Sequence, residues 1–337
     1  MAILSIKSVQ PEKYKDTGLS KKELLEMWRK MVLIRKFEEK VEELFLIKKL
    51  LKGPAHLYIG EEAVATGVIS ALTNDDVIVS HYRGHGHALA RGVPPRYIMA
   101  ELFGKATGTC KGVGGSMHSP KYPELNLMYA TAIVCSGIPI ATGMALAIKM
   151  KKENRVVTAF FGDGAVNSGA FHEGVNMAAI WKVPLLLVCE NNQYAISMRA
   201  DKATAGPGIA NRAEAYGITG AVVDGNDVIA VYMAAKDLIQ RIKNGEGPML
   251  LECRTYRIKG HGVYDQAQYR PQEEVEFWKK RDPILLYKDW LIKSGVATEE
   301  ELKEQERKVQ EEVEEAVSFA EQSPMLSLNE LSNFVYA

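Results

Sequence analysis

Two apolar runs joined by a segment of helix length constrain the fold of this chain more than any other feature. Residues 155–161 and 183–189 have the nearly continuous apolar character of strands that are buried on both faces. The segment Ala170–Trp181 between them is long enough for the crossover helix of a right-handed βαβ unit. The sequence therefore predicts an α/β fold, with a parallel sheet that carries helices on both faces.

Each run ends in polar residues of a kind that binds metal ions. Gly162-Asp163-Gly164 follows the first run, and Asn192 stands 29 positions after Asp163, directly beyond the second. The carboxyl ends of parallel strands meet at one edge of a sheet, so Asp163 and Asn192 are expected to face one crevice. A helix start at 167–169 would point backbone amides at a phosphate there. Either motif alone is typical of a tight turn, but together they predict a magnesium-diphosphate site.

The stretch from Gly162 to Asn192 resembles the thiamine-diphosphate motif. Residues 104–118 and 255–261 extend the similarity to the α subunit of the first component of 2-oxo acid dehydrogenase complexes, over roughly residues 19–283. Within that family, residues 56–63 and 81–87 are most similar to the acetoin dehydrogenase branch. The resemblance implies a thiamine-diphosphate-binding fold of the diphosphate type, with thiamine diphosphate and Mg²⁺ as cofactors.

The resemblance also assigns roles to individual residues. It implies that Mg²⁺ binds the side chains of Asp163 and Asn192 and the carbonyl of Tyr194. His56 and His261 are implied to be catalytic, at the substrate end of the cofactor, where a charge switch near pH 7 suits proton transfer. The other cofactor-binding positions that it implies are Tyr82, Arg83, Ala132, Val134, Gly164, Ala165, Ile196 and Arg257, together with His261. Ala132 departs from the usual glycine, which would disturb the site if this position required positive φ.

Several other histidines surround these positions. His56, His81, His85 and His87 suggest zinc at first sight, but no acidic or thiolate partner stands at a familiar spacing, so we discount a zinc site. Ordinary hydrogen-bonded side chains near the cleft explain His85, His87, His118 and His172 equally well, and none of these four is assigned a catalytic role.

One component of thiamine chemistry is missing from the chain. In the family, a glutamate on a separate domain protonates the aminopyrimidine, and a chain of 337 residues with one metal motif leaves room only for the diphosphate domain. Glu61 and Glu62 are conceivable substitutes, but we interpret them as acids favoured early in a helix by its dipole. The resemblance therefore implies a β subunit in an α2β2 assembly, and a lipoyl-bearing acyltransferase that receives the acyl group.

The resemblance implies a small-molecule substrate with a reactive carbonyl. Acetoin, pyruvate and a branched-chain 2-oxo acid all fit, and the resemblance favours acetoin or pyruvate. A nucleotide-dependent oxidoreductase is disfavoured because Gly169, not a glycine three positions after Gly164, follows the first motif. A non-catalytic binding module is disfavoured because the metal and arginine positions are intact.

The rest of the chain fits one α/β domain. We expect an N-terminal helical segment at 20–52, a cofactor-binding core at 55–260, and an active-site loop with a C-terminal helical region at 261–337. Capping boxes at Ser20 and Thr298 mark two helix starts, the second of a charged and largely solvated helix. The stretches 199–212 and 260–271 lack apolar periodicity and are expected to be mobile. The uncharged residues 125–148 are expected to form a subunit interface, with an ordinary core helix as the alternative.

Composition excludes several classes of protein. Lys plus Arg and Asp plus Glu both number 42, so no basic excess favours nucleic acid. Neither a signal peptide nor a membrane span is expected, because glycine, serine and proline interrupt the uncharged stretch. Four separated cysteines without a Cys-x-x-Cys motif indicate reduced thiols and a cytoplasmic protein. Gly262 occupies the position of a phosphorylated serine in regulated relatives, which excludes kinase control there.

Overall fold

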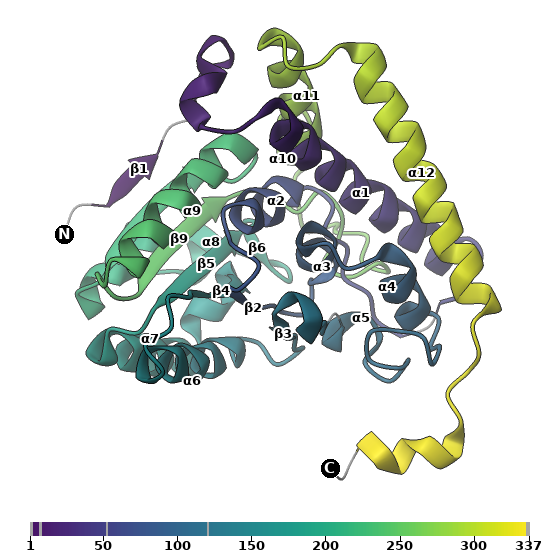
Figure 1. Cartoon of the computed structure of the whole chain (residues 1–337), viewed down its shortest axis with the longest axis horizontal. Helices are drawn as coiled ribbons and strands as arrows, with labels where there is room; N and C mark the ends of the chain where they lie inside the picture. The colour runs from purple at the N-terminus through teal and green to yellow at the C-terminus, as the bar shows by residue number, and fades with distance from the viewer. Residues whose placement is uncertain (1–2, 7–8, 52, 120, 335–337) are drawn as a thin grey trace.

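A seven-stranded sheet forms the centre of the computed structural model, which describes residues 3–6, 9–51, 53–119 and 121–334 (Figure 1). The strand order is β1-β8-β9-β5-β4-β2-β3, and every neighbouring pair is parallel. This confirms the predicted α/β fold. The strands are β1 (Leu4–Ile6), β2 (Val77–Val79), β3 (Leu127–Tyr129), β4 (Val157–Gly162), β5 (Leu185–Asn191), β8 (Thr219–Asp224) and β9 (Met249–Arg254). A separate hairpin joins β6 (Tyr194–Ala195) to β7 (Met198–Arg199).

The two predicted buried strands are the neighbours β4 and β5, each of which begins two residues later than the run that predicted it. Their side chains alternate between two hydrophobic cores, one on each face of the sheet. Phe160 and Val188 belong to one core, whereas Phe161 and Leu187 belong to the other. Because both faces are covered, a continuous apolar run is the pattern that such strands require.

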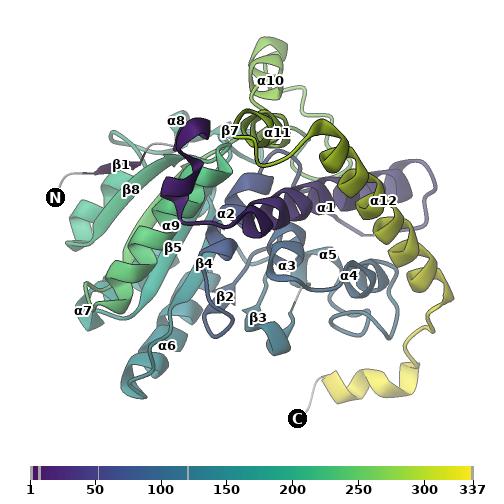
Figure 2. The same ribbon diagram turned by 45° about the horizontal axis from the view of Figure 1, so that its top comes forward.

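Helices cover both faces, as predicted (Figures 1 and 2). The larger core contains residues of α1 (Lys21–Leu46), α2 (Glu62–Ser70), α3 (His85–Arg91), α4 (Pro95–Leu102), α9 (Val228–Lys243), α11 (Pro283–Lys293) and α12 (Glu299–Gln322). The smaller core contains residues of α6 (Gly137–Met150), α7 (Gly169–Trp181) and the 3₁₀ segment η4 (Ala210–Tyr216). Shorter helices are α5 (Gly115–His118), α8 (Ala200–Ala203) and α10 (Gln272–Lys279), and the other 3₁₀ segments are η1 (Pro11–Thr17), η2 (Pro123–Leu125), η3 (Asp163–Asn167) and η5 (Leu328–Phe334).

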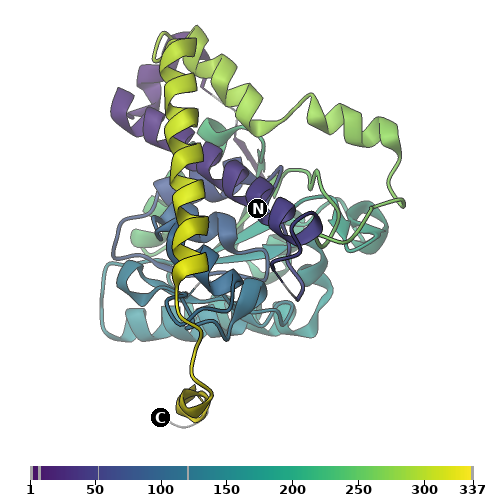
Figure 3. The ribbon, with the colours of Figure 1, turned by 90° about the vertical axis from the view of Figure 1, so that its right-hand side faces the viewer.

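Both predicted capping boxes are present. Ser20 caps α1 and Thr298 caps α12, and in each helix the glutamate at the third position reaches back to the cap. α1 ends at Leu46, before the expected limit of 52. α12 packs against α1 and α4 (Figure 3). A buried stripe that includes Leu302 and Val309 makes this contact, while most of the charged residues of α12 remain solvent-exposed.

The uncharged stretch 125–148 forms the end of η2, strand β3 and most of α6. α6 buries Ile138 and Ala145 against the sheet, whereas Pro139 and Gly143 lie exposed on its outer side. Among the described residues, no helix combines the length and the apolar character that a membrane crossing requires.

The parallel arrangement brings distant segments to one edge of the sheet. Apart from His56, which follows α1, the predicted site positions follow β3, β2, β4, β5 and β9, which are consecutive neighbours in the sheet. All five strands point their carboxyl ends the same way, so five segments scattered through the sequence meet above that edge.

Candidate active site

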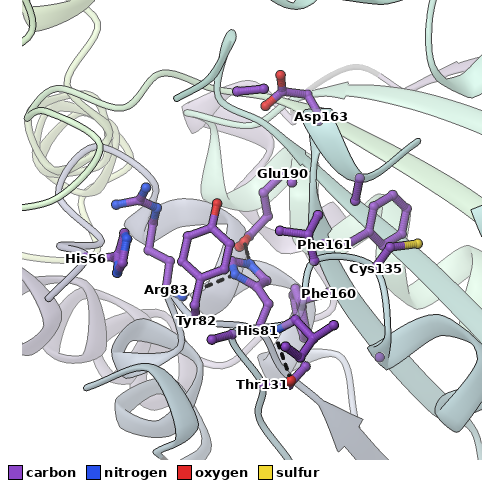
Figure 4. A pocket seen from close by; sticks show the side chains of 18 of the residues that line it. His56, His81, Tyr82, Arg83, Thr131, Cys135, Phe160, Phe161, Asp163 and Glu190 are labelled. Carbon is purple, nitrogen blue, oxygen red and sulfur yellow. Dashed lines mark hydrogen bonds and ion pairs between the residues drawn. The ribbon is translucent and has the colours of Figure 1, made fainter. Parts of the chain in front are cut away.

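A pocket of about 300 Å³ lies beyond the carboxyl ends of these strands (Figure 4). Figure 4 shows Asp163 at one end of the view and Thr131 at the other. Most of the predicted site residues line this pocket, although they derive from separate segments. Those that line it are His56, Tyr82, Arg83, Ala132, Val134, Asp163, Gly164, Ala165, Asn192, Tyr194, Ile196 and His261.

The predicted metal-binding residues are buried together at the pocket wall. Asp163, Asn192 and Tyr194 are each less than one-tenth exposed. The Oδ2 atom of Asp163 is buried and has no hydrogen-bond partner among the described residues. Burial raises the pKa of Asp163 to about 6, and the arginines Arg83 and Arg257 oppose this shift. An unpaired buried carboxylate oxygen is costly, and a bound cation would satisfy it.

The backbone after β4 differs from the prediction. The crossover helix α7 was expected to direct its N-terminus into the crevice, but the 3₁₀ turn η3 separates the strand from that helix. The pocket is lined by 162–165, and none of the described residues 167–170 is part of its wall. The turn η3 takes up five residues before the chain enters α7. The backbone amides near Asp163 therefore belong to this turn and not to the start of the helix.

Arg83 is almost wholly buried and lines the pocket. Its guanidinium donates from Nη1 to the Leu57 carbonyl at 2.7 Å and from Nη2 to the His261 carbonyl at 3.1 Å. Its Nε lies 3.5 Å from a carboxylate oxygen of Glu61. The fork thus connects three segments of the site and places a fixed positive charge beside the pocket.

Arg257 is the exception among the predicted residues. It is buried and does not belong to the described pocket wall. Its Nη1 donates to the Tyr194 carbonyl at 3.1 Å, and its Nη2 donates to the Ile196 carbonyl at 2.8 Å. The guanidinium therefore holds the 194–196 segment by its carbonyl groups, on the side that faces away from the pocket. That segment is strained, because Ile196, a β-branched residue, has φ of 54°.

His56 and His261 lie together at the pocket, with ring centroids 4.8 Å apart. Tyr82 packs against His56 at 4.7 Å. Burial, followed by the charge of Arg83, lowers the pKa of His56 to about 3 and that of His261 to about 4. The expected charge switch near pH 7 is therefore absent in this conformation. Both rings are neutral at pH 7 and are suited to accept a proton or a hydrogen bond.

These lowered pKa values make a prediction about stability. An unfolded histidine titrates near 6.5. Below that pH the unfolded chain binds protons that the buried rings do not, so stability should fall as the pH falls. The loss should reach up to about 1.4 kcal/mol per pH unit for each histidine, down to the folded pKa. Urea unfolding at pH 7 and pH 5.5 should show a smaller loss for His56→Gln than for the native chain. An equal loss in both would contradict the buried neutral state of His56.

A buried hydrogen-bond network centres on Glu190, which also lines the pocket. His81 Nε2 lies 2.6 Å from one carboxylate oxygen, and His87 Nε2 lies 2.9 Å from the other. The Tyr58 hydroxyl donates to Glu190 as well. The other nitrogens of these rings are also engaged, since Ser80 Oγ lies 2.7 Å from His87 Nδ1 and the Arg83 amide donates to His81 Nδ1 at 3.2 Å.

This network revises the argument about zinc. The acidic partner that the sequence spacing did not reveal is Glu190, and with His81 and His87 it forms a group that could geometrically hold a cation. Three side-chain donors already account for both oxygens of Glu190, and neighbouring groups occupy the remaining ring nitrogens. The cluster is therefore explained as a hydrogen-bonded wall of the pocket without a metal.

Glu61 also differs from its interpretation as an acid placed by the helix dipole. It stands at the N-cap of α2, but its side chain caps no amide there. Instead both carboxylate oxygens accept from Asn192 Nδ2, at 3.1 and 3.2 Å. The side chain is fully buried, which raises its pKa, and Arg83 opposes the shift. Glu62, by contrast, pairs with Arg35 at 2.6 Å, away from the site.

The end of the pocket formed by the loop after β3 is lined by apolar residues and is half open to solvent. Ile133 and Val134 are largely exposed there. Ala132 does not have positive φ, so alanine is compatible with the backbone at this position. Nearby, Cys135 has φ of 71° and is buried.

One carboxylate, which was not among the predicted site residues, holds the active-site loop together. Asp265 accepts from the His261 amide at 2.7 Å, from the Ala267 amide at 2.8 Å and from the Tyr269 hydroxyl at 2.7 Å. Glu61 and Glu190 were likewise missed as site residues. For Glu190 a signal existed, because a charged residue directly after a run predicted to be a buried strand requires a partner if it is buried as well.

His85 and His172 are engaged elsewhere. His85 Nδ1 lies 3.1 Å from Glu38, and its Nε2 lies 3.1 Å from Ser116 Oγ. His172 contacts the Tyr216 hydroxyl. These contacts agree with the interpretation of His85, His87 and His172 as hydrogen-bonded polar side chains, and none of the three lines the described pocket.

Comparison with known proteins yields a consistent set of relatives. A family model described as "Dehydrogenase E1 component" matches residues 29–329. The chain is 46% identical over 320 residues to the α subunit of acetoin:2,6-dichlorophenolindophenol oxidoreductase from Bacillus subtilis, covering 95% of each chain. It is 44% identical over 330 residues to the chloroplastic pyruvate dehydrogenase E1 component subunit alpha-3 of Oryza sativa, covering 95% of this chain and 77% of that relative. It is 40% identical over 329 residues to the pyruvate dehydrogenase E1 component subunit alpha of Rickettsia felis, covering 97% and 99%.

Proposed function

The chain belongs to the dehydrogenase E1 component family, and from this premise we propose that it is the α subunit of a pyruvate or acetoin dehydrogenase. It is a thiamine-diphosphate-dependent oxidoreductase of that family, and it works with a β subunit. In the proposed reaction a carbon-carbon bond beside a carbonyl is cleaved, and the acyl group passes to a lipoyl group on an acyltransferase component.

One observation carries the proposal of a magnesium-diphosphate site. The buried Oδ2 of Asp163, which has no hydrogen-bond partner in the described part of the chain, shares a pocket wall with Asn192 and Tyr194. These are hard oxygen donors, which Mg²⁺ prefers, and the protein supplies about half of its octahedral shell. The residues present thus fit the cation and leave room for phosphate oxygens.

The other residues of the pocket fit the rest of thiamine diphosphate. Arg83 would complement the diphosphate charge, with the backbone of Gly164 and Ala165 close to it. Ala132 and Val134 line the half-open end, where the aminopyrimidine would lie. When bound, thiamine diphosphate supplies the carbanion-stabilising group that the reaction requires. The protein supplies its placement and its electrostatic surroundings.

His56 and His261 are proposed to act on the substrate. Both rings line the pocket and are neutral at pH 7, so they can hold or accept a proton at the substrate oxygen. Arg257 is proposed to act indirectly, since it holds the carbonyl groups of Tyr194 and Ile196 in place.

The partner of this chain is proposed to supply the activating glutamate. Glu61 binds Asn192, and both oxygens of Glu190 are already occupied, so neither carboxylate is suited to protonate the cofactor. A β subunit in an α2β2 assembly would place its glutamate against the half-open end of the pocket. The exposed Ile133 and Val134 would then be covered.

The named relatives favour pyruvate and acetoin over a branched-chain 2-oxo acid. Pyruvate and acetoin would present a similar carbonyl to the same two histidines.

Calorimetric titration tests the proposal. Thiamine diphosphate with Mg²⁺ should bind the complex of this chain with its β subunit, and should bind the isolated chain at least 10-fold more weakly. The complex should then reduce an artificial dye with pyruvate or acetoin, and a branched-chain 2-oxo acid serves as the comparison substrate. Absence of cofactor binding to the complex would refute the proposal.

A further inference from the structure

The contact between Glu61 and Asn192 joins two segments 131 positions apart in the sequence. Glu61 is fully buried and does not belong to the described pocket wall, whereas Asn192 does. Glu61 therefore lies behind Asn192 as seen from the pocket. Its amide hydrogen-bonds to the Tyr58 carbonyl at the start of α2, which fixes the backbone from which the carboxylate extends.

The partners of Glu61 are all hydrogen-bond donors. Both of its oxygens contact Asn192 Nδ2, and one lies 3.5 Å from Arg83 Nε. The groups that face Glu61 are N–H groups, which can only donate, so the carboxyl oxygens that face them accept. At the other end of the Asn192 amide, Oδ1 accepts from the Tyr194 amide at 3.4 Å. These contacts together select one orientation of the Asn192 amide, with Nδ2 toward Glu61 and Oδ1 on the opposite side.

We propose that Glu61 is a positioning residue of the metal site, which commits Asn192 Oδ1 to the cation and links it to the arginine beside the diphosphate. The inference rests on the proposed function, since it assumes that Asn192 binds Mg²⁺. In this role Glu61 touches neither metal nor substrate. It removes the alternative amide orientation, in which Asn192 would present an N–H group to a cation.

Four variants of the α/β complex test the inference by calorimetric titration of Mg²⁺ in saturating thiamine diphosphate. Glu61→Gln should raise the Kd for Mg²⁺ by about 10-fold to 100-fold, because a glutamine can accept or donate and no longer selects the orientation. Glu62→Gln is the matched control. It removes the neighbouring buried carboxylate, which pairs with Arg35 rather than with Asn192, and should leave the Kd for Mg²⁺ within about twofold.

An exchange of the two polar groups gives the sharper test. Asn192→Asp alone places two carboxylates together and should weaken Mg²⁺ binding. In the double variant Glu61→Gln/Asn192→Asp, the glutamine amide can donate to one oxygen of the carboxylate introduced at position 192 and leave the other oxygen for the cation. The Kd for Mg²⁺ should then recover by at least about 10-fold relative to the Asn192→Asp single variant. This comparison still holds if Glu61→Gln alone fails to fold.

The outcomes separate this inference from the function on which it rests. If the native complex binds thiamine diphosphate with Mg²⁺ and the double variant shows no recovery, the positioning role of Glu61 is wrong and the proposed function stands. Unchanged Mg²⁺ affinity in Glu61→Gln would overturn the role in the same way. If the native complex shows no Mg²⁺-dependent binding, the proposed function fails and the role fails with it.

Discussion

Asp163→Ala is expected to weaken Mg²⁺-dependent binding of thiamine diphosphate to the α/β complex by at least about 100-fold, while the complex still assembles. Asp163 is the one charged side chain of the proposed metal shell, and its buried Oδ2 has no other partner among the described residues. Losing this oxygen removes both a ligand and the charge that favours the cation. Calorimetric titration measures the affinity, and gel filtration of the complex measures assembly.

Thermal unfolding of the cofactor-free chain provides an internal control for this variant. Burial raises the pKa of Asp163 to about 6, so at pH 7 the ionised side chain destabilises the folded chain relative to the unfolded one. Removing the carboxylate should therefore leave the melting temperature unchanged or raise it. Cofactor affinity equal to that of the native complex would refute the metal assignment. A lower melting temperature would show that Asp163 has a structural partner instead.

Arg83→Lys is expected to produce the second largest effect, a loss of thiamine diphosphate affinity of about 100-fold together with a loss of stability. A lysine cannot reproduce the two-armed contact of Arg83 with the Leu57 and His261 carbonyls. Hydrogen bonds to a charged group contribute roughly 1.5–3 kcal/mol each. The loss of one such contact to the diphosphate accounts for about 100-fold in affinity, and the loss of one carbonyl contact accounts for the fall in stability. Calorimetry and urea unfolding measure the two losses separately.

Arg91→Lys is the matched control for this prediction. Arg91 also donates to several backbone carbonyls, those of Thr73, Asn74, Asp76 and Leu125, but it lies outside the described pocket wall. Its replacement should lower stability without changing cofactor affinity in the assembled complex. If Arg91→Lys weakened cofactor binding as much as Arg83→Lys, the effect of Arg83 would reflect global destabilisation rather than its place at the pocket.

The strands β4 and β5 and the proposed metal-binding residues Asp163 and Asn192 could be predicted from the sequence, because short local patterns of residues indicate them. The apolar runs at β4 and β5 indicate that both faces of the sheet are covered. The residues just beyond two neighbouring parallel strands lie at one edge of the sheet. The capping boxes at Ser20 and Thr298 depend only on four consecutive residues, and both were confirmed. Residue roles such as that of Arg83 came from resemblance to a family, since no local pattern distinguishes a site arginine from a surface one.

Local patterns of residues are enough to specify the α/β class, the strands β4 and β5, the two capped helices and the placement of Asp163 and Asn192 at one pocket. Each of these follows from the period of apolar residues, from a cap motif or from where a strand ends. Other contacts emerge only when the chain is folded: Glu61 contacts Asn192, Glu190 lies between His81 and His87, and Arg257 lies behind the pocket wall. These contacts join residues 61 to 131 positions apart. They depend on how whole elements pack and on which buried polar groups can satisfy one another, and neither the period of a strand nor the spacing of a motif encodes that geometry.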